Sequence, residues 1–167
     1  RVGEDGGGDG DRWREMHANQ RMAAAERVAE SREAGRIDAA VLSNAIGDYV
    51  DEETIVLQGA TTNRVPALEQ IPLSEPGSFF WRGGAGLGWG VPGGIGVKLA
   101  APDHRVISLL GDGGYLFSNP AASVLAANNA DAPTLSVVYH NEGWKAVRRA
   151  TRKQHQTGAA AAQGVPE

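Results

Sequence analysis

Three apolar segments constrain the fold of this chain most. Residues 54–57, 105–110 and 134–139 are short runs dominated by Val, Ile and Leu, and they stay apolar along most of their length instead of alternating with polar residues. Strands that are buried on both faces show this pattern, which is typical of parallel sheets covered by helices. Segments of helical composition lie between the runs, so the sequence predicts a three-layer α/β fold, with a mostly parallel sheet and helices on both faces.

Two helices are expected before the first of these strands. The Ala-rich, charged segment Arg12–Ala34 suits a surface helix, with Gly35 as its C-terminal stop. A second helix is expected over Asp38–Val50, because apolar residues recur on one face at helical spacing. The residues of this face are Val41, Leu42, Ala45, Ile46 and Tyr49.

Further elements are expected around the later strands. Ser78–Trp81 suggests a brief strand, and the glycine-rich segment Arg82–Gly96 should lead into a helix that ends near Ala101. Asn119 followed by Pro120 predicts the start of another helix, with the Asn side chain as cap and Pro in the first turn.

The sequence also suggests how the chain is divided. Residues 1–11 combine glycine with acidic residues and show no periodicity, so we expect residues 1–36 to form a flexible linker and a connecting helix. Residues 37–167 should form the α/β domain. The C-terminal segment HQTGAAAAQGVPE shows no further strand, and the chain starts with Arg, so we expect a piece of a longer protein whose domain is incomplete at its C-terminus.

Composition excludes several classes of protein. A formal charge of −4 argues against a dedicated nucleic-acid binder. The absence of cysteine excludes disulfides, thiolate metal sites and cysteine nucleophiles. The apolar runs are far shorter than the roughly 20 residues that a membrane helix needs. No targeting segment is visible, so we expect a cytoplasmic protein without a membrane partner.

Two polar motifs follow predicted strands. Asp112 lies in GDGG, directly after the second apolar run, and Asn141 lies in YHNEGW, directly after the third. In parallel α/β sheets, ligands bind beyond the carboxyl ends of the strands, so the two motifs should face the same crevice. Asp112, Asn141 and the backbone carbonyl of Gly143 offer oxygen ligands, which suit Mg²⁺. The glycines next to Asp112 would let a diphosphate approach the backbone.

The combination of these motifs resembles thiamine-diphosphate-dependent enzymes, and in particular the acetolactate synthase and benzoylformate decarboxylase group. The segment GLGWGVPGGIGVKLAAPDHRVISLLGDGG is similar to the run that leads into the cofactor motif of that group, and NEG follows at the next strand end. The resemblance covers roughly residues 38–154. It identifies the chain as similar to the C-terminal, diphosphate-binding domain of these enzymes.

The resemblance implies a role for individual residues. Asp112 and Asn141 would bind Mg²⁺ through their side chains and Gly143 through its carbonyl. The remaining residues would contact the cofactor: Gly111, Gly113 and Gly114 at the diphosphate, Leu87 as the apolar wedge that bends the cofactor, and Thr61 and Thr62 in the loop after the first strand. No catalytic side chain is assigned within this chain.

This sequence departs from the family pattern in two ways. His140 stands where the family usually has a first asparagine, and the spacing between the motifs is slightly longer, which we attribute to the turn at 128–132. His140 is interpreted as a structural hydrogen-bonding residue rather than a base. Five basic residues without an acidic one among them are interpreted as a solvated helix face: Lys145, Arg148, Arg149, Arg152 and Lys153.

The function that the resemblance implies is decarboxylation or carboligation of 2-oxo acids through the thiazolium ylid of thiamine diphosphate, with Mg²⁺. The family activates the cofactor with a glutamate from a pyrimidine-binding domain, which this chain lacks. We therefore expect the chain to be inactive alone, to act as part of a lyase or transferase, and to need that domain from the same enzyme or a partner subunit. The full enzyme would be a homodimer or tetramer.

Two alternatives remain open at this point. The chain could be a separate diphosphate-binding subunit of a split 2-oxo-acid decarboxylase, or a non-catalytic remnant of the fold. A dinucleotide-binding domain is a weaker interpretation, because Gly86, Gly88 and Gly90 follow a loop and not a strand.

Overall fold

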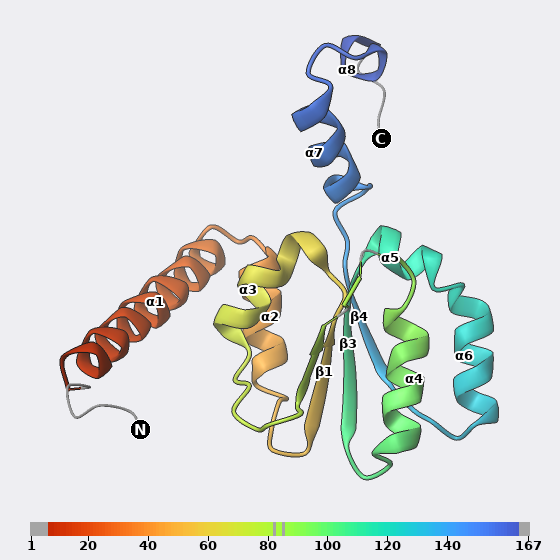
Figure 1. Ribbon diagram of the computed structural model, residues 1–167, viewed down its shortest axis with the longest axis horizontal. Coiled ribbons are helices and arrows are strands. Elements are labelled where there is room, and N and C mark those ends of the chain that lie inside the picture. The colour runs from red at the N-terminus through yellow and green to blue at the C-terminus, as the bar shows by residue number, and fades with distance from the viewer. Residues whose placement is uncertain (1–6, 82, 85, 164–167) are drawn as a thin grey trace. The chain divides into compact units, whose positions relative to one another are not determined.

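The computed structural model describes residues 7–81, 83–84 and 86–163, and the chain divides into two compact units. The first unit contains residues 1–50 and 65–72, and the second contains residues 51–64 and 73–167. Each unit is described separately (Figure 1). Within the described ranges, no helix combines the length and the apolar character needed to cross a membrane.

The first unit is helical. It contains α1 (Gly7–Glu33), α2 (Ala39–Gly47) and most of α3 (Arg64–Gln70). An ion pair joins Arg27 of α1 to Glu69 of α3 at 2.6 Å, and the Gln70 amide donates to the carbonyl of Ala24 at 2.8 Å. Ala24 and Val28 are the buried apolar residues of α1, so this helix packs along a narrow stripe and exposes most of its surface.

The predicted helix 12–34 forms, but it begins earlier than expected. α1 starts at Gly7, so the predicted linker is wrong for residues 7–11, while residues 1–6 lie outside the described part. A salt bridge between Asp11 and Arg14 lies in this added turn and supports it. The predicted stop is confirmed, because Gly35 adopts φ +66°, a conformation that favours glycine, directly after the helix.

The second helix is shorter than predicted. Asp38 is its N-cap and accepts hydrogen bonds from the backbone N–H groups of Ala40 and Val41. The helix ends at Gly47 instead of Val50, so the predicted place of Tyr49 on its apolar face is wrong, and Tyr49 is 71% exposed. A Cβ at Gly47 would lie 2.7 Å from the Gln70 carbonyl oxygen, so glycine permits the close approach of these two segments.

The second unit is built on a parallel sheet, as predicted. Its strands are β1 (Thr54–Gln58), β2 (Phe79–Trp81), β3 (Arg105–Gly111) and β4 (Leu135–Tyr139), in the order β2-β1-β3-β4. All three pairings are parallel. Every residue of β1 and the five central residues of β3 are buried, which confirms that these apolar runs are central strands.

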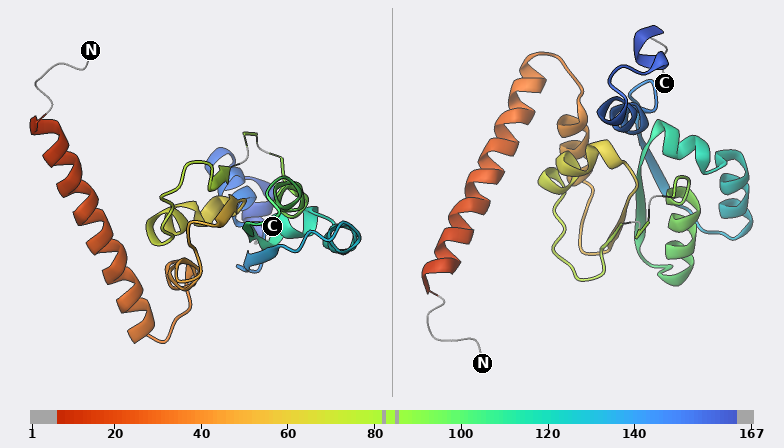
Figure 2. Two further views of the ribbon diagram at one scale, coloured as in Figure 1. Left: turned by 90° about the horizontal axis from the view of Figure 1, so that it is seen from below. Right: turned by 45° about the horizontal axis from the view of Figure 1, so that its top comes forward.

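The helices of the second unit that follow β2 and β3 pack around this sheet. α4 (Gly90–Ala100) lies against β1 and β3, where Ile55, Leu57 and Val106 form a buried cluster. α5 (Asp112–Phe117) continues directly from β3, and α6 (Pro120–Asn129) lies beside α4 (Figure 2). The helices α7 (Lys145–Gln154) and α8 (Ala159–Gln163) follow β4, beyond the carboxyl ends of the strands (Figure 1).

The predicted start of α6 is confirmed, but the predicted cap by the Asn119 side chain is wrong. α6 begins with Pro120 in its first turn, as expected, but Asn119 adopts a left-handed conformation (φ +47°) and its side chain makes no capping hydrogen bond. Instead, the hydroxyl of Ser123 donates to the carbonyl of Ser118 at 2.6 Å. A positive φ is tolerated by asparagine better than by most residues, which explains why it stands at this corner.

The strand order determines where a ligand can bind. From β1 the chain crosses to β2 on one side, and from β3 it crosses to β4 on the other side. The connections therefore diverge between β1 and β3, and this divergence opens a crevice at the carboxyl ends of the two strands. The loops that follow β1, β3 and β4 all reach this edge of the sheet.

Candidate cofactor-binding site

A hollow of about 60 Å³ lies at the carboxyl ends of the strands. All nine residues that the sequence analysis assigned to the cofactor or metal line it, although they come from four separate segments: Thr61, Thr62, Leu87, Gly111, Asp112, Gly113, Gly114, Asn141 and Gly143. The same hollow is lined by further residues that the sequence analysis did not single out for the cofactor: Gly59, Trp144, Lys145, Ala146 and Val147.

The Asp112 carboxylate is the centre of the hydrogen bonding here. Its Oδ1 accepts from the backbone N–H of Gly113 at 2.9 Å. Its Oδ2 accepts from the N–H groups of Asn141 at 3.1 Å and Gly143 at 3.2 Å, and lies 3.1 Å from Nδ1 of His140. The carboxylate therefore ties the loop after β4 to the start of α5.

These contacts keep Asp112 ionised. Burial acts to raise its pKa, but the backbone N–H groups of Gly113, Asn141 and Gly143, together with His140, outweigh burial and hold the pKa below its usual value. An ionised carboxylate offers an anionic oxygen, which is the kind of ligand that a divalent cation such as Mg²⁺ binds.

Asn141 provides the most specific indication that the hollow suits a cation. Its Oδ1 is buried and has no hydrogen-bond partner among the described residues. A buried amide oxygen without a partner is unfavourable, and a bound cation or water would satisfy it. The other buried polar side-chain atoms without a partner are the nitrogens Gln58 Nε2 and Trp89 Nε1, which are donors and which a cation would not satisfy.

The glycines of the site have two different roles. A Cβ added at Gly111 or Gly114 would meet no heavy atom within 4 Å, so these positions leave open space beside the backbone. A Cβ at Gly113 would lie 2.6 Å from the ring of Trp144, so this glycine permits close packing. At Gly88, φ is +87° and a Cβ would lie 2.3 Å from the Phe117 carbonyl oxygen, so glycine is required there.

The donor set fits Mg²⁺. It offers one carboxylate, one unpartnered amide oxygen and the carbonyl of the loop residue Gly143, and the glycines beside it leave room for an anion. The described part of the chain has no cluster of three or more His, Cys, Asp or Glu side chains that could hold a metal by themselves. The remaining ligands of a metal here would come from water and from a bound anion.

Residues 59–166 match the family model of the thiamine pyrophosphate enzymes, C-terminal TPP-binding domain. The chain belongs to this family. TPP stands for thiamine pyrophosphate, which is another name for thiamine diphosphate. Membership of this family implies that cofactor, usually with Mg²⁺.

Two curated relatives are much longer than this chain. Benzoylformate decarboxylase of Pseudomonas aeruginosa is 26% identical over 120 residues, which are 72% of this chain and 22% of the relative. Acetolactate synthase isozyme 1 large subunit of Escherichia coli (strain K12) is 27% identical over 122 residues, which are 72% of this chain and 21% of the relative. The chain thus spans about a fifth of the length of these relatives.

A solved thiamine diphosphate enzyme shows the same fold. The 4-hydroxybenzoylformate decarboxylase of Rhodococcus jostii RHA1 superposes with a TM-score of 0.67 at 25% sequence identity, over 74% of this chain and 23% of that chain. The α/β domain with a parallel sheet is therefore the fold of a thiamine-diphosphate-binding domain.

One residue outside the predicted cofactor and metal set adds a positive charge to the hollow. Lys145 begins α7, so a cation and the N-terminal end of a helix both border the hollow, and both favour an anion. The sequence contains this signal, since the basic run starts at Lys145; a solvated helix face is its default interpretation, and a contact to a partner subunit or an acidic cofactor is the less favoured one. The default interpretation is right for exposure, because all five basic residues of α7 are exposed.

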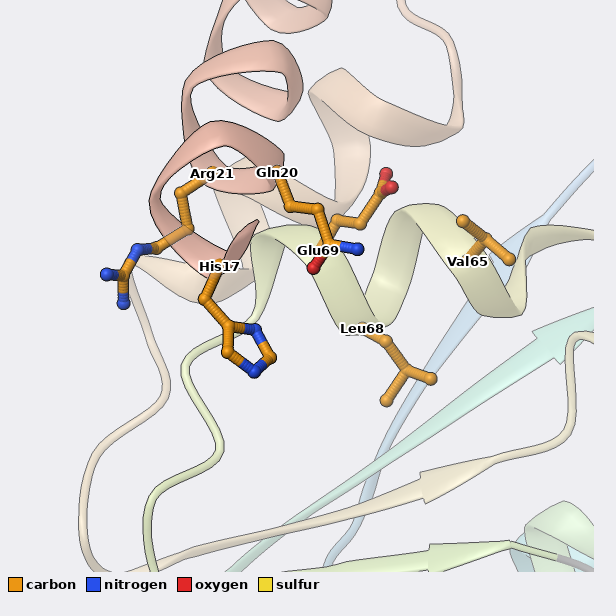
Figure 3. A pocket seen from close by; sticks show the side chains of 6 residues that line it. All are labelled: His17, Gln20, Arg21, Val65, Leu68 and Glu69. Carbon is orange, nitrogen blue, oxygen red and sulfur yellow. The ribbon is translucent and has the colours of Figure 1, made fainter. Parts of the chain in front are cut away.

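A second hollow, of about 340 Å³, lies within the first unit (Figure 3). His17, Gln20 and Arg21 of α1 line it together with Val65, Leu68 and Glu69 of α3. Its only carboxylate, that of Glu69, is already paired with Arg27. Among the residues that line this hollow, no carboxylate is therefore free to hold a metal.

Proposed function

We propose that this chain binds thiamine diphosphate through Mg²⁺ held by Asp112, Asn141 and Gly143. The observation that carries the proposal is the unpartnered, buried Oδ1 of Asn141 beside an ionised carboxylate that hydrogen-bonds to the same loop. Gly111 and Gly114 leave the open space that a diphosphate needs next to the backbone. Leu87 is 41% exposed at the hollow, which suits an apolar contact to the cofactor.

We further propose that the chain is the diphosphate-binding part of an acetolactate synthase-like enzyme that acts on 2-oxo acids. When bound, thiamine diphosphate supplies an electron sink for decarboxylation or carboligation. The residues of this chain hold and orient the diphosphate end, and none of them is assigned to the chemical step. We propose that the chain is inactive alone and acts as part of a lyase or transferase.

The size of the site supports the need for a second domain. The hollow of about 60 Å³ is far below the roughly 300–1,000 Å³ typical of sites that enclose an organic ligand. Leu116 and Phe117 of α5, which begins at the site, are 64% and 62% exposed. A pyrimidine-binding domain, from the same enzyme or a partner subunit, would cover such apolar surface and enclose the rest of the cofactor. A homodimer or tetramer of the full enzyme and a cytoplasmic location stay predictions.

Calorimetry of the full chain tests the binding proposal. Thiamine diphosphate is titrated with Mg²⁺ and again with EDTA, for the parent chain and for Asp112→Ala. We expect Mg²⁺-dependent binding that is lost in the variant. Asp103→Ala is the matched control, because Asp103 is an exposed carboxylate just before the opposite end of β3, and it should bind like the parent. Mg²⁺-independent binding, or equal binding by Asp112→Ala, would contradict the proposal.

Adding a partner tests the enzymatic proposal. The chain is mixed with the pyrimidine-binding domain of a relative, and CO₂ release is measured from a panel of 2-oxo acids that includes benzoylformate. Activity that needs both proteins would support a diphosphate-binding subunit or fragment. Tight cofactor binding in the mixture without turnover of any 2-oxo acid would instead favour the non-catalytic remnant.

A further inference from the structure

The two oxygens of Asp112 have unequal surroundings. Oδ2 has three donors, namely the N–H groups of Asn141 and Gly143 and the ring nitrogen Nδ1 of His140, at 3.1 to 3.2 Å. Oδ1 has one donor, the N–H of Gly113. A carboxylate oxygen has about two lone-pair sites, so Oδ2 is fully occupied and Oδ1 has room for one more partner.

We propose that His140 is a positioning residue for the metal: its Nδ1–H donates to Oδ2 of Asp112 and so directs Oδ1 toward the cation. This inference rests on the proposed function, because it assigns a role within the same Mg²⁺ site. His140 is thus an outer residue of the metal site and not a ligand, because its Nδ1–H donates to Oδ2 of Asp112.

The hydrogen bond determines the tautomer of His140. An ionised carboxylate can only accept, so the proton must be on Nδ1. His140 is 68% exposed, which leaves Nε2 in contact with solvent. The proposal therefore specifies which ring nitrogen carries the proton, and this can be measured without any metal.

His140 is also the contact that mutation can remove cleanly. Asp112 receives its other described hydrogen bonds from backbone N–H groups, which side-chain substitution does not abolish. Because His140 is mostly exposed, its truncation leaves no cavity in the core. Loss of an outer hydrogen bond to a metal ligand typically costs 10- to 100-fold in metal affinity.

The test uses the full 167-residue chain with thiamine diphosphate, and Mg²⁺ or Mn²⁺ as the metal. We expect the Kd for Mg²⁺ to rise about 10- to 100-fold in His140→Ala. His140→Asn, whose amide can donate to the same oxygen, should recover much of the affinity. His104→Ala is the control. This histidine precedes the opposite end of β3, and its described hydrogen bonds come from the backbone, whose N–H donates to the Ala101 carbonyl and whose carbonyl accepts from Lys98.

Two spectroscopic readouts separate positioning from a general structural effect. Nitrogen-15 NMR of the metal-free chain should show the His140 proton on Nδ1, and pulsed EPR of bound Mn²⁺ should show no directly bonded imidazole nitrogen. A proton on Nε2 alone, a bonded imidazole nitrogen that disappears in His140→Ala, or unchanged affinity of that variant would each overturn the proposal. If the parent chain itself shows no Mg²⁺-dependent binding, the proposed function fails, and the role of His140 with it.

Discussion

Two neighbouring glycines of α5 should respond in opposite ways to the same substitution. A Cβ at Gly113 would lie 2.6 Å from two ring atoms of Trp144, whereas ordinary contacts begin at about 3.4 Å. This ring packs edge-on against Phe117, with centroids 5.2 Å apart, so it cannot swing away freely. A Cβ at Gly114 would meet nothing within 4 Å.

The expected magnitudes follow from this difference. Replacing a helical glycine by alanine stabilises by roughly 0.5–1 kcal/mol, and both variants gain this term. Overpacking costs roughly 1–3 kcal/mol, and only Gly113→Ala pays it. The gain cancels in the comparison, so Gly113→Ala should be about 1–3 kcal/mol less stable than Gly114→Ala.

Urea denaturation of the two variants measures the difference directly, and thiamine diphosphate titration adds a second, independent result. The methyl group of Gly114→Ala would occupy open space that we assign to the diphosphate, so this variant should bind at least about 10-fold more weakly although it is the more stable one, a loss of about 1.4 kcal/mol. Equal stability of the two variants would refute the packing argument for Gly113. Parent-like binding by Gly114→Ala would refute the position of the diphosphate.

Three further outcomes test the fold. In α4, Gly96→Ala should raise stability by about 0.5–1 kcal/mol, because its Cβ meets open space. Gly94→Ala should lower stability by about 1–2 kcal/mol, because its Cβ would lie 2.7 Å from a buried serine hydroxyl of β3. The urea midpoints of the two variants measure this difference. Leu109→Ala empties a fully buried position in the central strand and should cost about 2–5 kcal/mol in the same assay. Asp38→Ala removes the α2 cap and should cost about 0.5–2 kcal/mol at neutral pH. The pKa of Asp38 is lowered first by the Ser31 hydroxyl and then by the backbone N–H groups of α2. The stabilisation by Asp38 is therefore fully present above the ordinary carboxyl pKa of 3.8 and is lost as pH falls through the lower pKa of the folded state, so thermal melts of parent and variant should converge there.

The central strands were predictable from the sequence because strands buried on both faces consist mainly of apolar residues. Val56 and Ile107 are fully buried and pair with each other in register, and both belong to runs without polar alternation. The order β2-β1-β3-β4 was not predictable in the same way. The third apolar run forms the edge strand β4, where Leu135 is 52% exposed, so an apolar run does not show which strands are central or on which side of its neighbour the next strand is placed.

Local rules were less reliable at the ends of helices. Asn119 has the right residue type for a cap, but the chain turns there with a positive φ and the Asn119 side chain makes no capping hydrogen bond. Tyr49 has the right spacing for the predicted apolar face of α2, but the helix ends before it, at Gly47. In both cases the residue type alone did not determine the backbone conformation.

In the candidate site, too, some residues could be predicted from the sequence, while some contacts depend on the folded backbone. Asp112 and Asn141 were predictable because each follows an apolar strand, and strand ends of a parallel sheet share one edge. The interpretation of His140 as a structural hydrogen-bonding residue is confirmed, but its partner could not be predicted, because the contact depends on the turn at Glu142, which adopts φ +60°. That turn presents two backbone N–H groups and one imidazole to the same oxygen of Asp112. A carboxylate so held has one oxygen committed to the protein and one available to a cation, which is why the arrangement is better suited to binding a metal than to proton transfer.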